Sequence, residues 1–387
     1  MDVEIVLSLG RRLVELNEVK AFDSVPYSVE ADTARYVDSK RWDLEKTEIF
    51  GRLPQLVGLS ADVAEPGDYW AFQFAGKPVV LVRGSDGFVR GFVNACRHRG
   101  TAFAEGRGKA AKQFVCPYHA WAYDTRGRLV GVPERGGFRD CNLETRNLIE
   151  LPVAEEFGLI VMSPTVDVTP SVSELLGPML PQIAPFDLGR ACFVKSRSQE
   201  IPINWKLINE ATIEGYHVIP LHGATLKKWM GDAGLRYFTY DRFGNHSRMV
   251  AGQKPLLNME ICPANAQEVF NNMNGDNYIF PSSFLSFGGQ SVAFQRAEPG
   301  AAPNKAILTI TNYSWDPNTT EEARAASEAL FDVIWEISLT EDVASMATAQ
   351  RAFDAGYPPT VVYGGVEPGV QDVNAAWDAA LVKGESN

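Results

Sequence analysis

Residues 94–124 read NACRHRGTAFAEGRGKAAKQFVCPYHAWAYD and hold two cysteines and two histidines of a chain that has five of each. The four residues form two close pairs, Cys96 with His98 and Cys116 with His119. Thiolates and imidazoles gathered this tightly are typical metal ligands. A zinc ion is one occupant that such a set would suit, because zinc accepts two Cys and two His in tetrahedral geometry.

The order of residues within each pair favours iron over zinc. Zinc motifs group ligands of like kind, whereas here each pair mixes Cys with His, as C-x-H and C-x2-H. Mixed pairs on two hairpin tips fit a [2Fe–2S] cluster in which one iron is held by two Cys and the other by two His. Gly100 and Pro117 allow both loops to turn tightly around such a cluster.

The pattern C-x-H-x17-C-x2-H resembles the Rieske motif of oxygenases. Respiratory Rieske proteins add one Cys to each loop for a disulfide, and this sequence has none at those places. The resemblance therefore implies that an oxygenase-type Rieske cluster is bound by Cys96, His98, Cys116 and His119. One position departs from many relatives. Ala120 follows His119 where Gly is common, and Ala is tolerated there if its φ is negative.

Composition limits the classes of protein that the chain can belong to. Its 387 residues suit two domains, and its net charge of −12 disfavours nucleic acid and anionic membranes as partners. Five Cys without a repeating framework fit a reducing compartment better than a disulfide scaffold. The first residues, MDVEIVLSLGRR, carry acids where a signal peptide has bases, and no apolar run is long enough to span a membrane. We therefore expect a cytoplasmic protein.

Two more histidines lie in the segment NEATIEGYHVIPLHG, where His217 and His222 are five residues apart. This spacing places them poorly on one face of an unbroken helix. If the helix ends at Pro220, the second His can turn back toward the same metal. A core histidine is the ordinary interpretation of either residue alone, but the pair, together with inward-facing Glu210 and Glu214, favours a metal site.

The segment NWKLINEATIEGYHVIPLH resembles the mononuclear-iron motif of Rieske oxygenases. The resemblance implies His217 and His222 as ligands, with Asp342 of the later segment LTEDVASMATAQR as the third. Two His and one carboxylate form the facial triad of non-haem Fe(II) oxygenases, which leaves positions open for O2 and substrate. The neighbouring Glu341 is the rival for the third place. Glu214, three residues before the first His, would link the two metal centres across a subunit boundary.

The residue pattern changes between the cysteine-containing region and the rest of the chain. Short Val, Phe and Tyr runs broken by Gly, Asp-Gly and Pro surround the cysteines and indicate hairpins, while longer helical patterns and strand-like runs follow. We expect an α+β chain in which a small all-β Rieske domain precedes a larger catalytic domain with an antiparallel sheet flanked by helices. The expected boundaries are an N-terminal helical arm packing with the catalytic domain at 1–65, the Rieske domain at 66–163 and the catalytic domain at 164–387.

The resemblance implies the terminal oxygenase alpha subunit of a Rieske system, acting as a mono- or dioxygenase. Electrons would pass through His119, Glu214 and His217 of a neighbouring subunit, so a homotrimer or a multiple of it is expected. No G-x-G-x-x-G opens a helix after a strand, so NAD(P)H would act only through a separate reductase, with or without a ferredoxin. An electron carrier without oxygenase activity is an alternative, but it would leave the second histidine pair unused.

The substrate class depends on the strand-like run YIFPSSFLSFGGQSVAF. An apolar pocket would be lined by Phe280, Phe284 and Phe287 if they face the metal. Such a pocket suits hydroxylation or demethylation of an aromatic or hydrophobic substrate, as in aromatic hydrocarbon catabolism. Plain sheet core is the alternative for these rings. Glu214 also fits monooxygenases of quaternary amines such as carnitine or betaine, and an acid near the metal beyond its ligands would favour that class.

Overall fold

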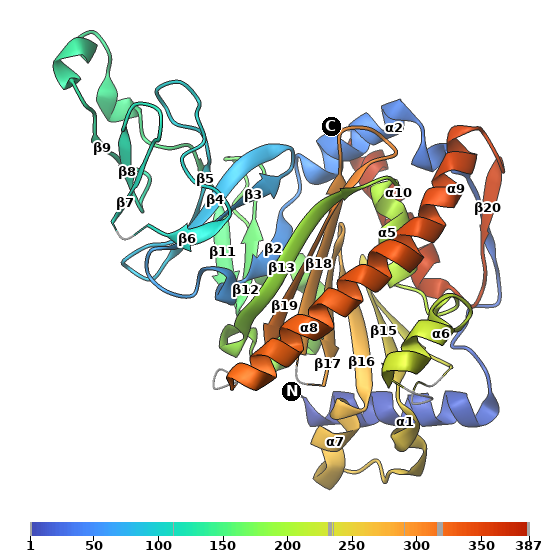
Figure 1. The fold of residues 1–387 in the computed structure, drawn as a ribbon. Helices are drawn as coiled ribbons and strands as arrows, with labels where there is room; N and C mark the ends of the chain where they lie inside the picture. The colour runs from blue at the N-terminus through green and yellow to red at the C-terminus, as the bar shows by residue number, and fades with distance from the viewer. Residues whose placement is uncertain are drawn as a thin grey trace. The chain divides into compact units, whose positions relative to one another are not determined.

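The computed structural model describes residues 2–110, 112–230, 234, 236–289, 291–315 and 320–384. The chain forms two compact units. The larger unit combines Met1–Ile49 with Leu176–Asn387, and the smaller unit is Phe50–Leu175. The expected α+β class is confirmed, because the smaller unit is built mainly of short strands and the larger unit combines an antiparallel sheet with long helices (Figure 1).

Three small antiparallel sheets make up the described part of the smaller unit. The first has, in spatial order, the strands β10 (Glu150–Leu151), β5 (Val89–Val93), β4 (Lys77–Arg83), β3 (Asp68–Phe74) and β6 (Arg107–Lys109). The second has β11 (Val153–Glu156), β12 (Leu159–Met162) and β2 (Gln55–Leu59). The third has β7 (Gln113–Val115), β8 (Ala122–Asp124) and β9 (Leu129–Gly131). The range expected for the Rieske domain, 66–163, lies within this unit, which also includes β2 because β2 pairs with β12.

The core of the smaller unit anchors both cysteine loops. Cys96 and Cys116 belong to one buried cluster with Val80, Phe92 and Tyr123, which come from three different strands. Burial of each large apolar side chain in such a cluster contributes about 1.5–3 kcal/mol. The loops therefore start from a packed base, and their tips are free to hold a ligand.

A single antiparallel sheet forms the centre of the described part of the larger unit. In spatial order its strands are β13 (Cys192–Ile201), β19 (Ala306–Ser314), β18 (Ser291–Pro299), β17 (Ser283–Gly288), β16 (Met273–Ile279), β15 (His246–Gly252) and β14 (Thr239–Phe243). Hairpins join most of these strands in sequence, which explains their antiparallel pairing. A separate two-stranded pair joins β1 (Val29–Asp32) to β20 (Thr360–Tyr363) and so ties the N-terminal segment to the C-terminal region.

Helices surround this sheet (Figure 1). The α-helices are α1 (Val3–Val19), α2 (Ser39–Leu44), α3 (Val172–Leu176), α4 (Leu180–Ile183), α5 (Trp205–Thr212), α6 (Val218–Met230), α7 (Ala266–Asn271), α8 (Glu321–Ile337), α9 (Ala344–Asp354) and α10 (Pro368–Gly384). Two π-helical segments, η2 (Glu45–Phe50) and η11 (Ser338–Val343), continue α2 and connect α8 to α9. Over the residues that the structure describes, no helix is both long and apolar enough to cross a membrane.

The two faces of the large sheet have different neighbours. Successive residues of a strand point to opposite faces. One row of direct cross-strand neighbours runs through Tyr240, Met249, Asp276, Ser286 and Ala293. This face, which we call the α5 face, carries α5, because Gln295 Nε2 donates to Thr212 Oγ1 at 2.9 Å. The opposite face, the α1 face, carries α1, whose Arg12 lies 2.6 Å from Asp241.

The expected helix end at Pro220 is wrong. The chain leaves α5 at Thr212, and α6 begins at Val218, so Pro220 lies in the first turn of a new helix. Proline fits there because the amides of a first turn have no intrahelical acceptor, and the missing N–H costs nothing. The break in the helical pattern therefore precedes both histidines, and His222 reaches the site from within α6.

Candidate functional site

The two Cys/His pairs occupy loops of the smaller unit that have the same backbone construction. In one loop the amide of Gly100 donates to the carbonyl of Cys96 at 2.8 Å, and in the other the amide of Ala120 donates to the carbonyl of Cys116 at 3.0 Å. Each cysteine amide in turn donates to the carbonyl five residues later, at 2.9 and 2.8 Å. Both loops thus fold back on their own cysteine, as the tips of a two-sided clamp would.

The side chains of these loops suit a metal cluster. The rings of His98 and His119 lie with their centroids 4.6 Å apart, and His98 stacks on Trp121 at 4.9 Å. Nδ1 of His98 is buried without a hydrogen-bond partner, which is costly unless a metal takes the lone pair. Burial, the charge of His119 and that of Arg99 lower the pKa of His98, and this favours the neutral imidazole that binds metals.

Sequence reasoning missed Tyr123 as a contact of the cysteine pair. Its hydroxyl lies 3.3 Å from Sγ of Cys96 and accepts a hydrogen bond from the amide of Arg97 at 2.9 Å. A hydroxyl beside a thiolate donates to it and tunes the bound centre. The sequence does show a tyrosine four residues after His119. Its contact with Cys96 could not be predicted, because it depends on the pairing of β7 with β8.

The condition set for Ala120 is not met, because its φ is 54° rather than negative. Gly100 occupies the same position of the other loop, four residues after its cysteine, and has a φ of 80°. The fold-back onto the cysteine carbonyl requires this left-handed backbone in both loops. An alanine held there costs about 1–2 kcal/mol, since its Cβ crowds the following carbonyl.

Replacement of Ala120 by Gly is therefore expected to stabilise the smaller unit by about 0.5–1 kcal/mol, because relief of left-handed strain exceeds the entropy that glycine adds to the unfolded chain. The measurement is the midpoint of thermal loss of the visible cluster absorption. Ala75, with a φ of 51° in the β3–β4 hairpin, offers a matched control that is distant in sequence from the ligands. A lower midpoint for Ala120→Gly than for the wild type would contradict the account.

The second pair of histidines meets an acid in the larger unit. His217 directly precedes α6, His222 lies in its second turn, and Asp342 belongs to the π-helical segment η11. Asp342 Oδ1 lies 2.9 Å from Nε2 of His222 and 3.5 Å from Nε2 of His217. One ligand atom from each of the three residues lies within 4.8 Å of the others. The structure thus brings together the three residues that the sequence selects.

The hydrogen bonds on the outer sides of the rings orient these atoms for a cation. Nδ1 of His217 contacts Glu214, and Nδ1 of His222 lies 2.7 Å from Glu341 Oε2. A carboxylate at Nδ1 fixes the tautomer with its proton on that nitrogen, which leaves the Nε2 lone pair directed inward. Two inward lone pairs beside the Asp342 carboxylate repel one another unless a cation lies among them. This donor set, two imidazoles and one carboxylate, fits Fe(II) with open positions.

The electrostatics of the site point the same way. Although burial alone would lower the pKa of His217, Asp342 and Glu214 raise it to about 9. Burial would also lower the pKa of His222, but Asp342 and Glu341 outweigh that effect and raise it. The site therefore attracts positive charge, and a metal cation would replace the protons that the carboxylates otherwise hold there.

The two neighbouring acids of η11 take different positions. Asp342 lies on the Nε2 side of His222, whereas Glu341 lies on its Nδ1 side and also accepts from the hydroxyl of Thr225 at 2.5 Å. Adjacent residues of a helix point in different directions, and here the two acids reach opposite sides of one imidazole. Single-turn π-helical segments of this kind occur frequently at functional sites. The geometry favours Asp342 over Glu341 as the third ligand.

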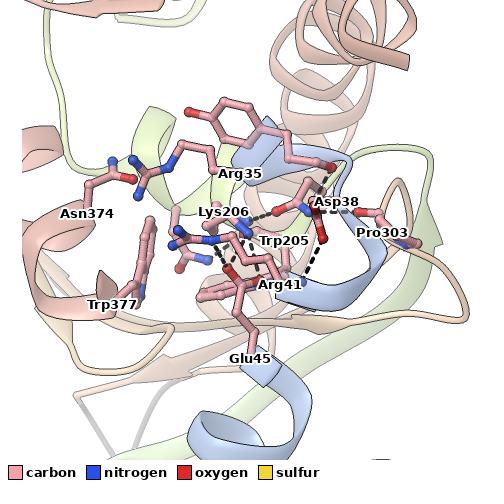
Figure 2. A network of polar contacts seen from close by, with 12 residues as sticks. Arg35, Asp38, Arg41, Glu45, Trp205, Lys206, Pro303, Asn374 and Trp377 are labelled. Carbon is pink, nitrogen blue, oxygen red and sulfur yellow. Dashed lines mark hydrogen bonds and ion pairs between the residues drawn. The ribbon is translucent and has the colours of Figure 1, made fainter. Parts of the chain in front are cut away.

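A buried polar network holds α5 in place (Figure 2). Lys206 Nζ lies 2.7 Å from Glu45 Oε2 with both side chains fully buried, and Nε1 of Trp205 donates to the same carboxylate at 2.9 Å. Burial lowers the pKa of Lys206 to about 8 despite the opposing effect of Glu45. Removing one member of such a pair leaves an unpaired buried charge and costs about 3–5 kcal/mol. The network therefore fixes the helix that leads into Glu214.

Glu210, four residues before Glu214, is buried and bonded to groups other than the imidazoles. The hydroxyl of Tyr36 donates to it at 2.8 Å, and Nδ2 of Asn374 donates at 2.9 Å. Burial raises the pKa of Glu210, while the charge of Arg35 opposes this. The sequence placed both acids beside the histidines, but Glu214 alone of the two contacts one of them.

The alternative for Phe280, Phe284 and Phe287, plain sheet core, fits the structure better than one shared pocket. Phe284 is fully buried on the α5 face, with its ring centroid 5.3 Å from that of Tyr278. Phe287 points to the α1 face, where it stacks on Phe186 at 4.1 Å and borders a small cavity with α1. Two residues three apart in a strand project to opposite faces. Phe280 follows the end of β16 and is also buried, so all three rings serve as core.

Comparisons with known proteins match both parts of the chain that carry these residues. Residues 54–147 match the Rieske [2Fe-2S] domain, and residues 188–383 match the catalytic domain of the ring hydroxylating alpha subunit. The chain is 30% identical over 230 residues to the glycine betaine monooxygenase oxygenase subunit of Pseudomonas aeruginosa, covering 59% of this chain and 53% of that one. It is 37% identical over 193 residues to the salicylate 5-hydroxylase large oxygenase component of Ralstonia sp, covering 46% and 45%.

A solved structure shares the fold. The quaternary ammonium Rieske monooxygenase CntA, in complex with an inhibitor, superposes with a TM-score of 0.76 at 20% identity, covering 90% of this chain and 94% of that one. In sequence, the chain spans about half the length of the curated relatives it matches. The structural likeness supports the architecture, and the sequence relatives include proteins named for an amine and for an aromatic acid.

Proposed function

Since the chain belongs to the family of ring-hydroxylating alpha subunits and carries a Rieske [2Fe–2S] domain, we propose that it is a terminal oxygenase component. It would oxidise a small organic substrate with O2, using electrons that enter through the Rieske cluster. The cluster would be held by Cys96, His98, Cys116 and His119. A mononuclear Fe(II) would be held by His217, His222 and Asp342.

The observation that carries this proposal is the convergence of two Nε2 lone pairs and one carboxylate oxygen in the larger unit. An iron held by three protein ligands on one side provides open positions at which O2 is activated beside a bound substrate. Glu214 and Glu341 hold the two imidazoles in the ligating tautomer from behind. A carrier of electrons would have no use for this second centre.

Glu214 would also serve the transfer of electrons between the centres. It contacts Nδ1 of His217, and a Rieske histidine of a neighbouring subunit would donate a second hydrogen bond to the 11% of its side chain that stays exposed. This role follows from the family resemblance and implies a cyclic homotrimer or a multiple of it. For a quaternary ammonium Rieske monooxygenase of the same fold, the solved structure gave insights into inter-subunit electron transfer in that protein. The reducing partner would be a separate reductase, with or without a ferredoxin, in the cytoplasm.

Metal analysis together with oxygen uptake tests the proposal. The purified protein, reconstituted with iron and sulfide, is expected to hold about three irons per chain, two in the cluster and one at the mononuclear site. Reductase-driven O2 uptake should rise when a substrate is added from a panel of amines and aromatic acids. Two irons per chain and no substrate-dependent uptake would instead identify an electron carrier and contradict the proposed function.

A further inference from the structure

The α5 face of the large sheet has an accessible patch at its centre. The patch consists of small or polar, partly exposed residues of β15–β18, namely Ala251, Asn274, Asp276, Ser286, Ser291, Ala293 and Gln295. On the α1 face the neighbouring positions are buried and mostly apolar, as at Val250, Leu285, Phe287, Val292 and Phe294. The small and polar side chains of the α5 face thus keep part of their surface accessible, although α5 lies over one end of the patch, where Gln295 contacts Thr212.

Tyr240 connects this patch with the metal site. It lies in the same cross-strand row as Asp276, two strands or roughly 10 Å away. Its hydroxyl accepts a hydrogen bond from the amide of Gly215 at 3.0 Å, in the segment between Glu214 and His217. Burial raises the pKa of Tyr240, and the charges of Glu214, Glu367 and Asp276 add to this, so all three acids lie within electrostatic reach of one hydroxyl. The patch therefore borders the site that would hold the iron.

Asp276 is the acid of this patch, and it has no cationic partner among the described residues. Its polar partner there is Ser286, whose hydroxyl donates at 2.5 Å. By contrast, Asp241 on the α1 face is paired with Arg12 and Arg248 at 2.6 and 2.7 Å. Desolvation by the surrounding protein raises the pKa of Asp276 to about 6, and the hydrogen bond from Ser286 opposes this shift. The carboxyl is therefore mostly ionised at neutral pH.

An anion of this kind is costly to the folded protein. A carboxylate that is partly withdrawn from water without a paired cation loses solvation that one hydroxyl replaces only in part. Groups held in this way cluster where a ligand supplies the missing interaction. The opposite charge would come from a ligand, which could approach Asp276 because the carboxylate and its neighbours Ser286 and Ala293 are partly exposed.

We propose that Asp276 binds the cationic nitrogen of an ammonium substrate and sets the preference of the enzyme for amines over neutral molecules. The inference rests on the proposed oxygenase function and concerns the same site. The cation would lie above the patch, with the phenol ring of Tyr240 on one side. A protonated amine would donate to the carboxylate, and a quaternary amine would interact with it through charge alone. The part of the substrate next to the nitrogen would then point toward the metal ligands.

Calorimetric titration of the iron-loaded protein with pairs of isosteric probes tests this assignment. Choline is compared with 3,3-dimethyl-1-butanol, its neutral carbon analogue, and benzylammonium with benzyl alcohol. We expect the wild type to bind at least one cation more tightly than its neutral partner, by on the order of tenfold or more. Asp276→Asn is expected to remove that preference, while Ser286→Ala, which keeps the charge, retains it. Asp332→Asn, a matched change of an exposed acid that pairs with Lys195 at 2.7 Å, should bind the probes as the wild type does.

Several results would overturn the proposal. These are equal or tighter binding of the neutral probes, no binding of either cation, and a preference that survives Asp276→Asn. Thermal unfolding of that variant at pH 8 guards against a folding artefact. Its midpoint should be at least that of the wild type, because Asn removes an unpaired charge. Failure of the underlying function has a different signature, namely two irons per chain and no oxygen uptake, and the proposal would fall with it.

Discussion

Glu214→Gln should leave both metal centres loaded and lower turnover on the order of 100-fold. The glutamine keeps a carbonyl that can accept from Nδ1 of His217, so the ligand stays oriented. It loses the negative charge that stabilises both hydrogen-bonded imidazoles along the proposed electron route. The measurements are iron content, the visible spectrum of the cluster, and the rate at which the reduced cluster is reoxidised when O2 and substrate are added.

Glu341→Gln is the matched control for this variant. Glu341 accepts from Nδ1 of the other ligand, His222, with nearly the same chemistry, but the family resemblance places no electron route through it. The loss in the control should be about tenfold at most and should come from weaker orientation of His222. If reoxidation of the cluster were as fast in Glu214→Gln as in the wild type, the bridging role would have to be abandoned.

Both metal sites could be selected from sequence because their ligands are mostly local. Each Cys/His pair of the cluster lies on one loop, Cys96 with His98 and Cys116 with His119. The spacing in the sequence is therefore enough to predict that each pair can bind a metal. His217 and His222 are also close in sequence, and the distant Asp342 was reached through a family pattern. The structure adds the reason for preferring Asp342 to Glu341, since η11 places one acid on each side of His222.

The substrate region could not be selected in the same way. Whether a strand residue faces the metal depends on register through four hairpin connections, and a shift by one residue exchanges the two faces. Hydrophobicity drew attention to Phe284 and Phe287, which are core on opposite faces. Asp276 stands in the unremarkable run MNGDNYI, and only its pairing with Met249 and Ser286 shows that it lies on the α5 face.

Two further features could not be predicted from the sequence, namely the backbone conformation at Ala120 and the packing of the C-terminal helix. The sequence does not show that the loop after Cys116 needs a positive φ at Ala120, because this follows from the hydrogen bond back to the cysteine. In the C-terminal segment, α10 places Trp377 in the core, where it donates to the carbonyl of Pro281 at 2.8 Å. The rings that pack against Trp377 come from β16 and α5, and the sequence of α10 alone does not predict these contacts.

Asp342→Ala should remove the mononuclear metal and leave the Rieske spectrum unchanged, which makes it the variant with the largest expected effect on the reaction. The change deletes one of three ligands and leaves His217 and His222 without the carboxylate that offsets the charge of the cation. Iron content should fall from about three to about two per chain, and substrate-dependent O2 uptake should vanish.

The neighbouring residue makes this prediction decisive. Glu341→Ala removes a carboxylate of the same η11 segment, but one that lies behind His222 on the Nδ1 side and holds Thr225 as well. It should weaken metal binding by about 10–100-fold and still allow full loading at high iron concentration. If Asp342→Ala kept the third iron while Glu341→Ala lost it at every concentration, the assignment of the two acids would be reversed. In that case Glu341 would be the ligand, and the inward position of Asp342 beside both Nε2 atoms would need another cause.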